Sequence, residues 1–160
     1  MSAEPLSARP SAPAAPAIAW QDDRHPLRVA EMDLAHREFV ELVNALANCP
    51  DREFAERFKS LMNHTRAHFA AEEELMMKSG FPALGEHAGE HKRVIDELSQ
   101  FGRGLNRGRV FLARSYVQSG LPEWFSLHLA TMDAALAAHL NAVRASGVQV
   151  ELTRNTLPVL

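Results

Sequence analysis

The chain has 160 residues, about one domain's worth, and a formal net charge of −3 with positive and negative residues interleaved. This charge pattern excludes a basic surface for nucleic acid. The single cysteine, Cys49, excludes an internal disulfide framework and is typical of a reducing cytosol. No apolar run approaches the ~20 residues that cross a bilayer, so we expect a cytoplasmic protein with no membrane partner. Eight histidines against one tyrosine favour a metal site, because histidine is the commonest metal ligand.

Residues 1–19 are rich in proline, alanine and serine, and their prolines prevent an apolar signal-peptide core. This composition predicts a disordered or extended N-terminal arm, which could dock a partner protein. We expect residues 20–147 to form one helical domain. The C-terminal tail, residues 148–160, lacks a clear pattern and could pack as an extended strap or fray.

The first two helices are marked by acidic residues at their starts. Asp33 is a suitable N-cap for a first helix that stops at the Asn-Cys-Pro of residues 48–50. Asp51 is expected to cap a long second helix, which Gly80 and Pro82 end.

The third helix is expected to open near Leu84 and to break at Gly102, Gly104 and Gly108. A fourth covers residues 109–145, where Pro122 should kink or restart it. Four helices with short connections predict an all-α, antiparallel, up-down-up-down four-helix bundle.

The second helix carries one acidic residue on its core stripe. The stripe alternates steps of four and three residues through Phe54, Phe58, Leu61, Thr65, His68, Glu72 and Leu75. Glu73 and Glu74 lie roughly 100° and 200° further round, facing a flank and solvent. A carboxylate on a core stripe is costly unless it is paired or binds a metal, so Glu72 needs a partner.

Histidines occupy the stripes of the other helices as well. His87 and His91 stand four apart on the third helix and can chelate one ion. His128 shares the fourth helix's expected stripe with Leu121, Phe125, Met132 and Ala135. Asp133 is five residues after His128, about 140° round, so spacing alone does not place it on the same face. On the first helix, His36 is in line with Val40 and Val43.

In an antiparallel bundle, the histidines and carboxylates named on the four helices would all lie at the same height along the bundle axis. Any one histidine alone would more often be an ordinary core or surface residue, and Glu72 alone could be solvated. Together they indicate a shared site. His64 is interpreted as an outer or surface residue and His25 as a surface residue, while His139 lies about 16 Å beyond His128 along the helix.

Five imidazoles and two carboxylates are too many ligands for one closed tetrahedral zinc site. They suit two bridged ions that prefer octahedral coordination, and nitrogen and oxygen donors without thiolate favour iron or manganese. The Glu-x-x-His pairs of carboxylate-rich di-iron bundles are absent from the sequence.

Four ordered motifs resemble those of the bacterial hemerythrin-like proteins: MDLAHREF, HFAAEEELM, GFPALGEHAGEH and WFSLHLATMD. The resemblance covers about residues 20–145. It implies a hemerythrin-like bundle with a non-haem di-iron centre. One iron would be bound by His87, His91 and His128 and the other by His36 and His68, with Glu72, Asp133 and an oxo or hydroxo group as bridges.

The resemblance further implies reversible dioxygen binding, as a carrier, store or sensor, at an open position on the two-histidine iron. No catalytic residue is marked, and we expect a monomer. The alternatives are a di-iron enzyme acting on peroxide, nitric oxide or ferrous iron, and an interaction module with a structural metal. Pro122, Phe125 and His64 depart from the family pattern, and Phe125 could narrow the oxygen pocket.

Overall fold

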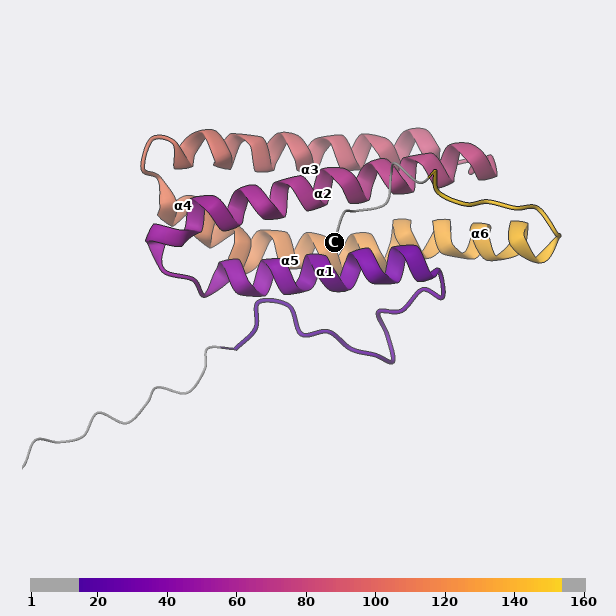
Figure 1. The fold of residues 1–160 in the computed structure, drawn as a ribbon, viewed down its shortest axis with the longest axis horizontal. Coiled ribbons are helices and arrows are strands. Elements are labelled where there is room, and N and C mark those ends of the chain that lie inside the picture. The colour runs from indigo at the N-terminus through magenta and orange to yellow at the C-terminus, as the bar shows by residue number, and fades with distance from the viewer. Residues whose placement is uncertain (1–14, 154–160) are drawn as a thin grey trace, which may run out of the picture.

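A computed structural model describes residues 15–153 as a bundle of four helical runs lying side by side (Figure 1). The first three runs are α1 (Ala30–Ala47), α2 (Asp51–Ser79) and α3 (Leu84–Leu105). The fourth run extends from Val110 to Ala145, and none of the described residues form a strand. The short connections make neighbouring helices antiparallel, which confirms the expected all-α bundle.

The fourth run contains two widened turns. Its segments are α4 (Val110–Ser115), η1 (Tyr116–Gly120), α5 (Leu121–His128), η2 (Leu129–Asp133) and α6 (Ala134–Ala145). The turns η1 and η2 are π-helical: the Leu121 N–H donates to the Tyr116 carbonyl, and the Ala134 N–H donates to the Leu129 carbonyl. Each such i→i+5 bond fits one extra residue into the turn.

These two turns keep a four-residue repeat facing the core. The repeat consists of Ala113, Val117, Leu121, Phe125, Leu129, Asp133 and Ala137, all of them buried. In a straight α-helix, steps of four drift by about 40° each, so six steps would drift by about 240°. The two extra residues, one in η1 and one in η2, cancel about 200° of this drift, because each residue of a helix turns by about 100°. The repeat therefore stays on the inner face.

The predicted stripe of the fourth helix was therefore wrong beyond His128. Met132 is half-buried and Ala135 is exposed, whereas Asp133 and Leu136 are buried. The physical reason is the extra residue in η2, which rotates the following segment by about 100° relative to a regular α-helix.

Pro122 lies in the first turn of α5, directly after η1. A proline is tolerated there because its missing N–H would belong to the start of an α-helical segment. The chain remains helical through Pro122, and the α-helical hydrogen-bond pattern resumes there after the wide turn η1. Of the two expectations for Pro122, a kink or a restart, this arrangement corresponds to the restart.

Two expected caps lie inside their helices. α1 begins at Ala30, so Asp33 stands in its first turn, and the Asp33 carboxylate instead accepts the backbone N–H groups of Leu27 at 2.6 Å and Arg28 at 3.1 Å. Asp51 is the first residue of α2 and accepts from the Arg114 guanidinium at 2.7 Å. Both predicted N-caps were wrong, because other donors occupy these carboxylates.

The glycines after the third helix also behave differently from the prediction. α3 continues through Gly102 and Gly104 to Leu105, and the turn is made further on by Gly108, whose φ is +75°. Gly80 ends α2 as expected, in the left-handed conformation with φ of +68°.

Two apolar clusters flank a polar layer across the bundle. One cluster contains Phe39, Phe54, Leu61, Leu98 and Phe125 among others. The second contains Met32, Leu75, Met76, Leu136 and Leu140 among others. Along α1, α2 and the fourth run, His36, Glu72 and Asp133 lie between members of the two clusters.

The described ends of the chain pack against this bundle. Ile18 is buried, and its backbone N–H and carbonyl are bonded to the Asn44 side chain at 2.9 and 2.8 Å. After α6, residues 147–153 turn back along the bundle as an extended strap with Val150 buried (Figure 1). The expectations for residues 1–14 and 154–160 lie outside the described residues. Among residues 15–153, every helix is too short or too polar to cross a bilayer.

Gly120 in η1 provides a test of how tightly this wide turn is packed. A Cβ on Gly120 would lie 2.9 Å from Cδ2 of Tyr116, whose ring stacks on Phe101 and whose hydroxyl donates to Glu97 at 2.9 Å. We expect Gly120→Ala to lower the free energy of unfolding by about 1 kcal/mol, since overpacking outweighs the gain in helix propensity.

Gly89→Ala is the matched control for chemical denaturation, because a Cβ at Gly89 meets nothing within 4 Å on α3. This variant should gain about 0.5–1 kcal/mol from helix propensity. Equal gains in both variants would contradict the packing of Tyr116 against Gly120.

Candidate metal centre

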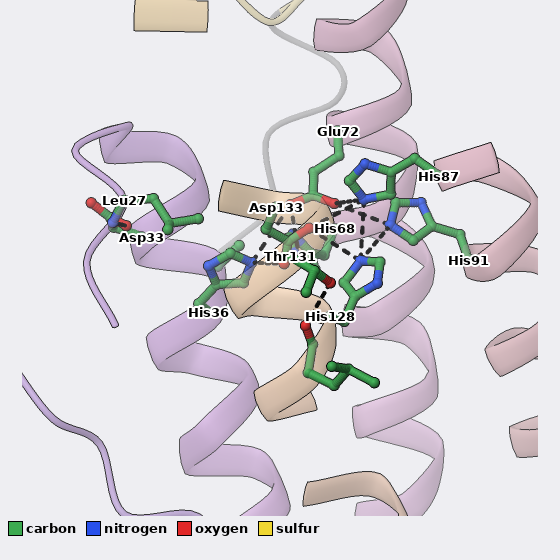
Figure 2. A network of polar contacts seen from close by, with 12 residues as sticks. Leu27, Asp33, His36, His68, Glu72, His87, His91, His128, Thr131 and Asp133 are labelled. Carbon is green, nitrogen blue, oxygen red and sulfur yellow. Dashed lines mark hydrogen bonds and ion pairs between the residues drawn. The ribbon is translucent and has the colours of Figure 1, made fainter. Parts of the chain in front are cut away.

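Seven buried side chains from all four helical runs meet in the polar layer (Figure 2). Each is 1–7% exposed. They are His36 of α1, His68 and Glu72 of α2, His87 and His91 of α3, His128 of α5 and Asp133 of η2. The structure thus brings together every residue that the sequence and the resemblance proposed as a metal ligand.

Glu72 directs one carboxylate oxygen toward each of two histidine groups. Its Oε1 atom lies 3.4 Å from Nε2 of His68 and 3.5 Å from Nε2 of His36. Its Oε2 atom lies 3.2 Å from Nε2 of His91 and 3.7 Å from Nε2 of His87. The carboxylate therefore stands between two sets of nitrogen donors.

Asp133 divides its oxygens in the same way. Its Oδ2 atom lies 3.2 Å from Nε2 of His36, and its Oδ1 atom lies 3.1 Å from Nε2 of both His87 and His128. The wide turn η2 explains how Asp133 reaches the face of His128. With one extra residue in the turn, the fifth residue takes the place that the fourth takes in an α-helix.

Several buried nitrogen and oxygen atoms of this site form no hydrogen bond to other protein groups. Although imidazole nitrogens lie nearby, no hydrogen bond is formed by either carboxylate oxygen of Glu72, by Oδ1 of Asp133 or by either ring nitrogen of His36. Nε2 of His128 lies only 3.1 Å from Nε2 of His87 and 3.3 Å from Nε2 of His91. Buried polar atoms left without partners are costly, so converging donors of this kind fit cations.

The donor set divides into two overlapping groups that can each hold a metal ion. One comprises Glu72, His87, His91, His128 and Asp133, and the other comprises His36, His68 and Glu72. The first group has three imidazoles and the second has two. Glu72 belongs to both groups, as a bridging ligand must.

Electrostatics keep the two carboxylates ionised in this buried layer. Burial raises the pKa of Glu72, and so does the charge of Asp133, but His68, His36 and His91 outweigh both and hold the pKa below its ordinary value. Burial likewise raises the pKa of Asp133, while the imidazoles of His128 and His36 lower it further. Two ionised carboxylates at this depth require positive charge beside them.

The two histidines of the smaller group differ in charge when only protein groups surround them. Burial lowers the pKa of His36, but Asp133 and Glu72 outweigh it and raise the pKa to about 9. Burial lowers the pKa of His68 to about 4, so its ring is neutral at pH 7. A cation bound here would displace the His36 proton, as metal binding at histidine requires.

Aromatic rings hold the imidazoles of the three-histidine group in place. Phe69 stacks on His91 with ring centroids 3.8 Å apart and an interplanar angle of 3°. Trp124 stacks on His128 at 4.7 Å, and its indole N–H donates to Glu90 at 2.8 Å. Our sequence reasoning missed Phe69 and Glu90, although Phe69 directly follows His68. Such outer contacts orient ligand rings.

The three consecutive glutamates of α2 have three different surroundings. Glu72 lies inside the site, and Glu73 is 40% exposed with Oε1 3.5 Å from Nδ1 of His91. Glu74 pairs with Lys78 on the outer side at 2.6 Å. Glu73 takes the flank position that the sequence predicts, whereas Glu74 does not face solvent as expected: its side chain is 14% exposed and accepts the Thr153 N–H.

The remaining described histidines bond to the backbone outside the seven-residue cluster. Nε2 of His64 lies 3.0 Å from the carbonyl of Ala35, and Nε2 of His139 lies 3.0 Å from that of Ser79. His25 accepts the Gln21 N–H through Nδ1 at 2.9 Å. The His64 ring centroid is 6.2 Å from that of His68, so His64 is next to the cluster rather than in it.

A small aromatic cavity adjoins the two-histidine group. Its volume is about 10 Å³, about the room that one water-sized molecule requires. His36 and His68 line it together with Phe39, Phe69, Trp124 and Phe125. Phe125 stacks on Phe39 at 5.1 Å and lies 5.8 Å from His36, so it forms part of the wall of this cavity.

Trp124 offers a spectroscopic test for a metal ion at the three-histidine group. Because the indole stacks on His128, a paramagnetic metal bound there should quench Trp124 fluorescence. We expect titration of metal-free protein with ferrous iron to quench emission in wild type and in Trp20→Phe, since Trp20 packs on His25 and Arg37 instead. Trp124→Phe should lose most of this quenching, and quenching that persists there would contradict a metal beside His128.

Comparisons with known proteins agree with this arrangement. The family model of the hemerythrin HHE cation binding domain matches residues 27–140. A bacteriohemerythrin of Ralstonia nicotianae is 34% identical over 125 residues, which are 78% of this chain and 90% of the relative. One from Stenotrophomonas maltophilia is 27% identical over 78% of this chain and 84% of the relative, and one from Aquifex aeolicus is 29% identical over 68% and 87%. The chain belongs to the hemerythrin family, as its four motifs suggested.

Proposed function

We propose that this protein holds two iron ions and binds dioxygen reversibly, as a carrier, store or sensor rather than as an enzyme. The observation that carries the proposal is the placement of two ionised carboxylates, Glu72 and Asp133, between a group of three imidazoles and a group of two. Membership of a cation-binding family and relatives named bacteriohemerythrins support it.

In this proposal His87, His91 and His128 hold one iron, and His36 and His68 hold the other. Glu72 and Asp133 would each supply a ligand to both ions. Imidazole and carboxylate donors without thiolate, in a set too large for one tetrahedral ion, favour a pair of iron or manganese ions. The two carboxylates would compensate two of the four positive charges of a diferrous pair, which leaves a positive site in a water-poor layer.

The unequal division of imidazoles leaves the two-histidine side with fewer protein ligands, and both of its histidines line the aromatic cavity. Two ferrous ions can give two electrons to dioxygen and recover them when the oxygen leaves. Four aromatic side chains form the apolar part of the cavity wall: Phe39, Phe69, Trp124 and Phe125. All of its titratable lining residues, His36, His68, His128 and Asp133, are assigned as ligands, so none is left as an acid or base, and oxygen should leave unchanged.

The decisive experiment exposes anaerobic, ferrous protein to oxygen and follows the visible spectrum. We expect about two irons per chain and an absorbing adduct that disappears under vacuum and returns with oxygen over several cycles. Immediate conversion to a ferric form with rapid consumption of peroxide would overturn the proposal in favour of an enzyme. A chain that retains no iron would indicate an interaction module.

Removing the bridge at Glu72 tests the ligand assignment. Glu72→Ala should reduce the iron content from about two to one or fewer per chain, because both ions lose a shared carboxylate ligand. Elemental analysis of purified protein measures this, and circular dichroism confirms that the helices remain. Glu86→Ala, a change of an exposed glutamate on α3, is the control and should retain both ions. Unchanged iron in Glu72→Ala would refute the bridge.

A further inference from the structure

A second, larger cavity lies between α1 and α2 under the C-terminal strap, residues 147–153. Its volume is about 70 Å³, and His68 and Glu72 form part of its wall. We propose that this cavity is the entry and holding site for the small uncharged ligand of the centre, and that the strap controls access to it. This inference rests on the proposed dioxygen-binding function and adds the path by which the ligand arrives.

The walls of this cavity select for an apolar ligand. Met32, Ala35, Ala71 and Leu75 line it from the two helices, and Leu152 lines it from the strap. An engineered cavity of about 150 Å³ with similar apolar walls binds benzene or xenon, so about 70 Å³ suits a molecule of a few atoms. Leu34, another wall residue, is 51% exposed, which brings the cavity to the protein surface.

Two of the polar residues around the cavity, His64 and Glu31, already have partners elsewhere, and the other two, His68 and Glu72, are proposed iron ligands. Nε2 of His64 is directed at the Ala35 carbonyl, 3.0 Å away, and Glu31 at the rim is paired with Arg144. A charged or strongly hydrogen-bonding molecule would therefore lose its hydration without compensation. A diatomic gas loses little hydration and can enter.

His68 connects this cavity to the centre. It lines both the 70 Å³ cavity and the aromatic cavity beside His36. A ligand held under the strap therefore lies against the side chain of a proposed iron ligand that also borders the aromatic cavity. Small displacements of the His68 ring would join the two spaces.

The strap is held over the cavity by a few anchors on its outer side. Val150 is 1% exposed, and its carbonyl accepts from Arg144 at 2.7 Å. Beyond it, the Lys78 ammonium donates to the Glu151 carbonyl at 2.7 Å, and the Thr153 N–H donates to Glu74 at 2.7 Å. Solvent-accessible bonds of this kind contribute little each, so the segment around Leu152 can open while Val150 stays buried.

The first test locates the ligand site without using oxygen. Crystals of the iron-loaded protein are pressurised with xenon, which occupies dry apolar cavities. We expect xenon beside Ala71 and Leu152 in wild type and none there in Ala71→Leu, whose larger side chain fills the space. Ala55→Leu, the same change at an exposed position of α2, should retain xenon. A wild-type cavity without xenon would overturn the inference.

The second test measures how fast oxygen enters and leaves. By flow and flash methods, Ala71→Leu should slow both association and dissociation by about tenfold, with little change in affinity. Lys78→Ala should accelerate both rates, because the strap loses its Glu151 anchor. Lys92→Ala is the matched control, since Lys92 likewise pairs with a carboxylate one helical turn away, Asp96, but on α3 and away from the strap.

The outcomes separate this inference from the proposed function. Wild-type rates in both Ala71→Leu and Lys78→Ala, in protein that binds oxygen, would refute the entry route and leave the proposed function intact. Failure of wild type to bind oxygen would refute the proposed function, and the entry route with it, even where xenon fills the cavity. Because Lys78 is on the surface, its variant remains informative if Ala71→Leu folds poorly.

Discussion

Two buried negative charges are the constraint on which the rest of this bundle depends. Glu72 and Asp133 are each about 1% exposed, and the imidazoles around them keep both ionised. Such charges are tolerated in a protein interior only beside positive charge. The four helical runs supply five imidazoles beside these carboxylates, and an apolar cluster lies on either side of the layer.

The regular helices made most of this site predictable. On α2 the alternation of four and three residues identified His68 and Glu72 as inward-facing, and the same geometry paired His87 with His91 on α3. The antiparallel topology then predicted that His36 and His128 lie at the same height along the bundle as these residues. In these elements side-chain direction follows from spacing alone, because an α-helix turns by about 100° per residue.

The features that could not be predicted depend on contacts distant in sequence. Asp33 looked like a helix cap, but backbone donors of the preceding turn bind it instead. The strap carries no periodic pattern, and its position depends on anchors such as Lys78 and Arg144 from other helices. The place of Asp133 came from resemblance to a family, since its spacing from His128 does not fit a regular α-helix.

The wide turns of the fourth run bear on how helical sequences are interpreted. An apolar step of four, kept over many residues without the usual step of three, cannot stay on one side of a regular α-helix. Wherever such a strict tetrad repeat faces a core, either the helix wraps around its neighbours or it has inserted residues. Here the repeat from Ala113 to Ala137 is visible in the printed sequence, and its phase includes Asp133. A buried residue at every fourth position over many residues therefore indicates π turns in a helix, and it also indicates acidic residues, such as Asp133, that these turns direct inward.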